Sequence, residues 1–216
     1  MNKQNTRGFV LSFVAVTFAL LAIGGFASYA LYERIDDKNR AELLKNTALM
    51  ARTLPLSEIQ MLSGEPMDVD SPEYKRVKVA LQEGLAVDGD IRFTYLMGQN
   101  EKDELFFFAD SEEVGSADES KPGDVYYEAT EGMKNIFVSG KGIAEGPDRD
   151  RWGVWISAYW PIKNVDGNVV ALLGMDIPAN DFIFDIVVYS LFPILVALLI
   201  ILLLYIIHRN EPKTSY

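Results

Sequence analysis

Residues 150–177 have the sequence DRWGVWISAYWPIKNVDGNVVALLGMDI. Two runs rich in aromatic and β-branched side chains, 152–163 and 168–177, lie on either side of Asp166 and Gly167. An Asp-Gly pair between two such runs is typical of a tight β-turn. The stretch therefore predicts an antiparallel hairpin, and with it a domain built on a sheet.

Strand alternation assigns the hairpin side chains to two faces, because successive residues of a strand point to opposite sides. One face of the first strand is expected to carry Trp155, Ser157 and Tyr159, and the other Trp152, Val154, Ile156 and Trp160. One face of the second strand carries Val170, Leu172, Gly174 and Asp176. A carboxylate at the end of an apolar strand is costly to bury unless another group satisfies it, which makes Asp176 a candidate functional residue.

Upstream of the hairpin, residues 92–98 (RFTYLMG) and 104–110 (ELFFFAD) predict two more strands joined by a polar turn. Alternation predicts that Phe93 and Tyr95 share a face in the first of them. In the second, it groups Phe106, Phe108 and Asp110. Residues 111–123 are expected to form a surface loop, 125–137 a helix, and 142–144 a short strand.

The segment before these strands is expected to be helical. Residues 33–54 contain no Gly or Pro and have helical spacing, so this helix should continue a preceding apolar one. A short helix is expected from Ser57 to about Gly64. Ser71, Pro72 and Glu73 predict the start of a helix, with a buried face formed by Tyr74, Val77, Leu81 and Leu85. The fold class is therefore α+β, with an antiparallel sheet and a long N-terminal helix.

Two apolar runs, 8–32 and 186–207, contain no charged side chain. Each exceeds the roughly 20 residues that a helix needs to cross a bilayer. We expect two transmembrane helices, at 9–32 and 182–207. A cleaved signal peptide is the alternative for the first run, because Ser28-Tyr29-Ala30 resembles a cleavage site.

Charge predicts the orientation of these spans. The stub 1–8 and the tail 208–216 are rich in basic residues, which favours a cytoplasmic location for both. The segment between the spans holds 30 of the 31 acidic residues and 16 of the 20 basic ones. This charge disfavours nucleic acid or an anionic membrane surface as its neighbour. We therefore expect residues 33–181 to form an extracytoplasmic domain of a protein in the cell membrane.

The residue types leave little room for catalysis. The chain has no cysteine and a single histidine, His208, at the expected membrane edge. We therefore predict no catalytic residues, no metal site and no cofactor, since Asp148 and Asp150 lack the spacing of a calcium loop. The aromatic side chains with a few polar groups are the composition either of a sheet core or of a small-molecule pocket. In a pocket, Arg149 and Arg151 could pair with a ligand carboxylate and the acids with an amine.

These motifs resemble the extracytoplasmic PAS-like sensor domains known as Cache or PDC domains, of the single-lobed kind, over about residues 9–207. The similarity is sharpest at RFTYLMG, FFFAD (106–110), PGDVYYEA (122–129) and the hairpin. The resemblance implies a PAS-like sheet with a pocket for a small-molecule ligand. Its implied ligand-binding residues are Tyr95, Asp110, Tyr126, Trp155, Ser157, Tyr159 and Asp176. The Arg-x-Trp-Tyr pattern of amino-acid-binding members is absent, since this chain has Arg149-Asp150-Arg151-Trp152-Gly153.

The resemblance also implies partners. Such domains are input regions of bacterial histidine kinases, diguanylate cyclases and chemoreceptors, and they usually act as homodimers; here residues 33–54 are the expected interface. No kinase or cyclase motif follows residue 207. We therefore expect a non-enzymatic chain that signals through a cytoplasmic output domain or a partner protein. The alternative is an envelope scaffold protein whose PAS-like domain docks another protein.

Overall fold

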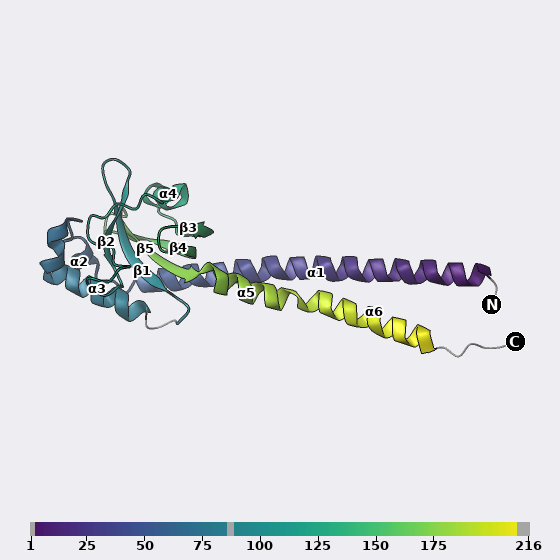
Figure 1. Ribbon diagram of the computed structural model, residues 1–216. Coiled ribbons are helices and arrows are strands. Elements are labelled where there is room, and N and C mark those ends of the chain that lie inside the picture. Colours follow the sequence, from purple (N-terminus) through teal and green to yellow (C-terminus); the bar gives the residue numbers. More distant parts are fainter. Residues whose placement is uncertain (1–2, 86–88, 211–216) are drawn as a thin grey trace. The chain divides into compact units, whose positions relative to one another are not determined.

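The computed structural model describes residues 3–85 and 89–210 (Figure 1). The chain forms two compact units. One is the central domain, Lys38–Phe182, and the other combines the two apolar ends of the chain. Each of the two units is defined by the contacts within it.

The central domain is built on five antiparallel strands. They are β1 (Phe93–Gln99), β2 (Leu105–Asp110), β3 (Ile143–Arg149), β4 (Val154–Lys163) and β5 (Val169–Pro178). Their order across the sheet is β2-β1-β5-β4-β3. β4 and β5 form the predicted hairpin, in which Gly167 has a φ of +86°, a conformation that glycine adopts without steric cost. The α+β class with an antiparallel sheet is confirmed.

Helices cover both faces of the sheet (Figure 1). α3 (Pro72–Leu85) begins as predicted, because the Ser71 hydroxyl accepts a hydrogen bond from the Tyr74 backbone N–H at 3.1 Å. The helix packs on the face of β1 that carries Thr94, whose hydroxyl donates to the Leu81 carbonyl. α4 (Glu131–Ser139) buries Met133 against the opposite face.

The α3 side of the domain includes the C-terminal part of α1 (Lys3–Ala51). The helix continues without a break into the central domain, as predicted. There Leu43 is buried, and Met50 packs against Gly84 of α3, where a side chain would collide with it. The short α2 (Leu56–Ile59) and a 3-10 helix, η1 (Pro66–Asp70), connect α1 to α3. The α2 helix ends earlier than predicted.

The prediction of a helix over 125–137 was wrong at its start. The Thr130 hydroxyl accepts a hydrogen bond from the Met133 N–H and caps α4 there. The preceding residues instead extend the sheet edge: Val125 bridges to Phe106, and the Tyr126 N–H donates to the Leu105 carbonyl. Strand β3 is also longer than predicted.

The face prediction for β2 was wrong because a β-bulge interrupts the alternation. Tyr95 pairs with Asp110 and Met97 pairs with Phe107, so β2 has one extra residue between these pairs. Phe107 therefore shares a face with Asp110, and Phe106 and Phe108 pack together on the other face. The face predictions for Trp155, Ser157, Tyr159 and Asp176 agree with the observed pairing.

The unit formed by the chain ends contains two helices long and apolar enough to cross a membrane, within Leu11–Ala51 and Ala179–Asn210. The second expected span is divided into α5 (Ala179–Ser190) and α6 (Phe192–Asn210). Pro193 has no N–H, which interrupts helical hydrogen bonding near this point. The Ile194 N–H then donates to the Ser28 hydroxyl of α1 at 3.2 Å, and Gly24 leaves room for Ala197 beside it. Small residues and polar bonds of this kind are typical of packed membrane helices.

Candidate functional site

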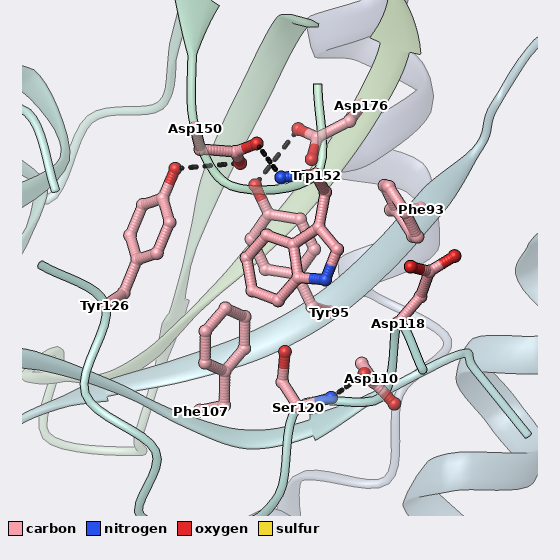
Figure 2. A pocket seen from close by; sticks show the side chains of 10 residues that line it. All are labelled: Phe93, Tyr95, Phe107, Asp110, Asp118, Ser120, Tyr126, Asp150, Trp152 and Asp176. Carbon is pink, nitrogen blue, oxygen red and sulfur yellow. Dashed lines mark hydrogen bonds between the residues drawn. The ribbon is translucent and has the colours of Figure 1, made fainter. Parts of the chain in front are cut away.

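A cavity lies on the α4 side of the sheet, beneath the segments that follow β2 and β3 (Figure 2). Its volume is about 20 Å³, which is space for roughly one water molecule. Its buried lining consists of Phe93, Tyr95, Phe107, Asp110, Ser120 and Asp176. Its half-buried lining consists of Asp118, Tyr126, Asp150 and Trp152.

Asp176 occupies the buried end of the cavity and is only 4% exposed. The Tyr95 hydroxyl donates to its Oδ1 at 3.0 Å. Burial raises the pKa of Asp176 from 3.8 to about 7, against the opposing effect of hydrogen bonds from Ser157 and Tyr95. The negative charge of Asp150 adds to the rise. Within the described part of the chain, Asp176 thus has neutral hydroxyl groups as its hydrogen-bond donors, and its pKa lies close to neutral pH.

Asp150 organises the turn that leads into β4. Its Oδ1 accepts hydrogen bonds from the backbone N–H groups of Trp152 and Gly153 and from the Trp155 indole N–H, at 2.8 to 2.9 Å. Its Oδ2 accepts from the Tyr126 hydroxyl at 3.2 Å. These bonds place the Trp152 ring at the cavity. Strand alternation had predicted that this ring lies on the opposite face of the sheet. That face prediction fails because Trp152 precedes the strand.

Asp110 lines the cavity, but its carboxylate is bonded on the α3 side. Lys78 Nζ donates to its Oδ1 at 2.9 Å, and the Ser120 backbone N–H donates to its Oδ2 at 2.6 Å. Lys78 is only 5% exposed and also lies 3.6 Å from Glu119. Burial raises the pKa of Asp110, opposed by these bonds. The Lys78–Asp110 ion pair links the end of β2 to helix α3.

Aromatic rings form most of the remaining wall. Phe107 lies edge-on to Tyr95, Tyr126 and Trp152, with centroid distances of 5.6, 5.7 and 5.9 Å. Tyr126 stacks on Trp152 at 6.4 Å, and Phe93 lies 6.5 Å from Trp152 on its other side (Figure 2). Such mostly apolar walls with a few placed polar groups are typical of small-molecule sites.

The predicted site residues divide into two groups. Tyr95, Asp110, Tyr126 and Asp176 line the cavity. Trp155, Ser157 and Tyr159 lie in the buried sheet layer next to it, where Ser157 pairs with Asp176 across the β4–β5 ladder. Among the described residues, no cluster of three or more His, Cys, Asp or Glu side chains could hold a metal ion.

The lining residues that sequence reasoning did not assign to the pocket are Phe93, Phe107, Asp118, Ser120, Asp150 and Trp152. Strand alternation put Phe107 on the wrong face because it did not allow for the bulge in β2. Asp150 was considered only as a calcium ligand. Asp118 and Ser120 lie in a segment read as surface loop. The one available signal was the Asp150-x-Trp152-Gly153 spacing, which suits a carboxylate that caps its own turn.

The sensory domain of the Campylobacter jejuni chemoreceptor Tlp3 has a similar structure, with a TM-score of 0.50 and 13% identity over 80% of this chain and 66% of that one. In its complex with 4-methylisoleucine, the Tlp3 domain has a TM-score of 0.51 at 14% identity, over 77% of this chain and 62% of that one. The central domain therefore has the same fold as this sensory domain. The expected family resemblance is thereby confirmed at the level of the fold.

Two further proteins are similar to this chain. An extracellular ligand-binding receptor from Desulfohalobium retbaense has a TM-score of 0.51 at 12% identity, over 74% of this chain and 26% of that one. A probable methyl-accepting chemotaxis protein of Bacillus thuringiensis subsp. konkukian is 29% identical over 92 residues, or 40% of this chain. The match spans only 16% of that protein. No family model matches the chain.

Proposed function

We propose that this chain is a membrane-anchored sensor whose Cache-type domain binds a small molecule in the cavity at Asp176. The observation that carries the proposal is that cavity: buried polar groups and aromatic rings converge on one point of a sensory fold. Two helices of membrane-spanning length and composition flank the same domain. An envelope scaffold protein would not need a cavity lined by carboxylates.

The proposed topology places both chain ends in the cytoplasm and the Cache-type domain outside it. Its support is the distribution of charge, because basic residues prevail at both ends of the sequence and acidic ones prevail between the spans. A signal would then leave the domain along α1 and along α5 and α6, toward a cytoplasmic output domain or a partner protein. We assign no catalytic role to the chain.

We further propose that the sensor works as a homodimer through the part of α1 in the central domain. Lys38, Glu42, Lys45 and Leu49 lie at exposed positions of this helix. Their spacing of three and four residues places them on one side of it. A ligand that favours one arrangement of two such helices would shift the dimer between states.

Cysteine cross-linking tests binding and signalling together, because the chain contains no natural cysteine. Full-length Lys45→Cys and Leu49→Cys proteins in membrane vesicles are oxidised with and without compounds from a library of carboxylates, amino acids, amines and purines. We expect disulfide-linked dimers whose rate of formation changes with at least one compound. The same compound should raise the melting temperature, as linkage requires for a ligand of the folded state.

Val165→Cys is the matched control, because Val165 is 95% exposed and lies in the β4–β5 turn, outside the proposed interface on α1. Its cross-linking should not respond to the compound. Trp152→Ala should abolish both the thermal shift and the response at Lys45→Cys. A library without any stabilising compound, together with unchanging cross-links, would contradict the sensor proposal and favour the scaffold protein.

A further inference from the structure

We propose that the cavity of the Cache-type domain selects an organic cation without a carboxylate, such as an alkylammonium or quaternary ammonium ion. The inference rests on the proposed function, in which this cavity is the ligand site. Three observations support it: the carboxylates that line the cavity, the aromatic rings around them, and the absence of basic side chains from the described lining.

Four carboxylates line the cavity, and two of them already have cationic partners. Asp110 is paired with Lys78 at 2.9 Å. Asp118 is paired with Arg92 at 2.9 Å. Each of these two acids therefore already has a cationic partner within the protein.

The other two carboxylates, Asp150 and Asp176, have only neutral donors among the hydrogen bonds described above. Asp150 is bonded to backbone N–H groups, an indole and a phenol, and Asp176 is bonded to hydroxyl groups. Burying carboxylates without a countercharge is costly. The raised pKa of Asp176, to which Asp150 contributes, expresses that cost. A bound cation would supply the missing charge to both.

The rings around the cavity favour the same kind of ligand. Tyr95, Phe107, Tyr126 and Trp152 stand next to one another with centroid distances between 5.6 and 6.4 Å. The face of an aromatic ring attracts a cation within about 6 Å of its centroid. Several rings that converge beside a carboxylate therefore suit an ammonium group with apolar substituents.

The described lining contains no Lys, Arg or His side chain that could receive a ligand carboxylate. Arg149 is exposed, and Arg151 lies 4.2 Å over the Trp152 ring without lining the cavity. Arg92 is engaged with Asp118 and Glu112. An anionic group in the cavity would meet carboxylates and negative ring faces, so anions and zwitterions are disfavoured.

We expect a ligand to enter past Tyr126, which is half-buried in the cavity lining. Its ring stacks on Trp152, and its hydroxyl donates to Asp150 Oδ2 at 3.2 Å. Tyr126 and Trp152 both lie on connecting segments and not on strands. An ammonium ion larger than the cavity of about 20 Å³ would displace Tyr126 and take over the Oδ2 that it releases.

Calorimetry on the full-length protein in nanodiscs at pH 8 tests this with two shape-matched series. The first is isobutylammonium, isobutanol, L-valine and isovalerate; the second is choline, 3,3-dimethylbutan-1-ol, glycine betaine and 3,3-dimethylbutanoate. We expect saturable binding by a cation in at least one series. Its neutral, zwitterionic and anionic counterparts should bind roughly tenfold more weakly or worse.

Three variants assign the effect to the two carboxylates. Asp150→Asn and Asp176→Asn keep the shape and an acceptor oxygen but remove the charge, and each should weaken cation binding by roughly tenfold or more. Asp166→Asn removes one charge from the exposed β4–β5 turn and should bind as the wild type does. Unchanged binding in both cavity variants would overturn the proposal.

Two further outcomes would also overturn it: no binding by either cation, or equal or tighter binding by a zwitterion, an anion or an alcohol. Where a zwitterion or an anion binds instead, Trp152→Ala separates this failure from failure of the proposed function. If the variant loses the binding of the zwitterion or anion, the cavity remains the ligand site and only the ligand class is wrong. If that binding persists, the cavity is not the site.

Discussion

Asp110 and Asp176 are two buried acids of the same sheet with opposite electrostatic surroundings. Each is 4% exposed and lies at or near the end of a strand that lines the cavity. Asp110 is neutralised from within the protein by Lys78, whereas Asp176 is hydrogen-bonded only by hydroxyl groups. Burial alone therefore does not identify a carboxylate that binds a ligand. What distinguishes Asp176 is the absence of an internal countercharge among its described contacts.

Breaking the internal pair should have the largest effect. Lys78→Met leaves Asp110 and Glu119 buried without their cation, so we expect a loss of about 3–5 kcal/mol in the free energy of unfolding. Urea denaturation of the full-length protein in detergent measures it. Lys75→Met, on an exposed position of the same helix, should cost less than about 0.5 kcal/mol. A similar small loss for Lys78→Met would contradict the structural role of the pair.

Neutralising Asp176 should raise the free energy of unfolding instead of lowering it. Asp176→Asn removes a charge that is costly to bury, and we expect the variant to gain on the order of 1–3 kcal/mol of stability at pH 8 without added ligand. Because the folded pKa is raised from 3.8 to about 7, the contribution of Asp176 is present below about pH 4 and is lost as the pH rises to about 7. The wild type should therefore lose stability across this window more steeply than the variant. Thermal unfolding of both proteins at a series of pH values measures how steeply the stability of each falls with pH.

Cation binding should show the corresponding pH dependence. If the ligand requires ionised Asp176, choline should bind roughly tenfold more weakly at pH 6 than at pH 8, because only a minor fraction is then competent. The groups that face Asp176 are Tyr95, Tyr159, Tyr126 and Asp150. Burial raises the pKa of all three tyrosines, so they stay neutral in this range. Calorimetry at both pH values measures the ratio, and Asp176→Asn should abolish it.

The β2 bulge allows the smallest and most specific test. Phe107→Leu removes a ring from the cavity wall, and Phe108→Leu removes one from the opposite face. Both should cost about 1 kcal/mol of stability, but only Phe107→Leu should reduce cation affinity, by roughly threefold to tenfold. Equal affinities in the two variants would mean that the ring at Phe107 does not contact the ligand.

Much of the fold follows from local signals in the sequence. The Asp166-Gly167 turn, the Ser71 cap and the alternation in β4 and β5 each depend on a few neighbouring residues, and each prediction agrees with the structure. Two other features depend on interactions between distant segments and were not predicted. The bulge depends on how β2 pairs with β1, and the burial of Lys78 depends on an acid 32 residues away.

The site was predictable in part. Tyr95 and Asp176 were named as pocket candidates from the family resemblance, and in the structure they are hydrogen-bonded to each other. Trp152 was assigned to the opposite face and Asp150 was not assigned to the pocket, because a turn and not a strand presents them to the cavity. The distinction between Asp110 and Asp176 was not accessible at all, since the two acids follow similar apolar patterns and differ only in what α3 brings to one of them.

Because α1 runs without interruption from Lys3 to Ala51, a residue inserted within it changes the phase of the helix. Each inserted residue turns everything that follows by about 100°. One residue added near Asp37 would therefore present a different side of the helix to its surroundings, whereas seven would nearly restore the original side. Natural length changes in this connection should accordingly come in multiples close to whole turns, and engineered fusions should keep to the same steps.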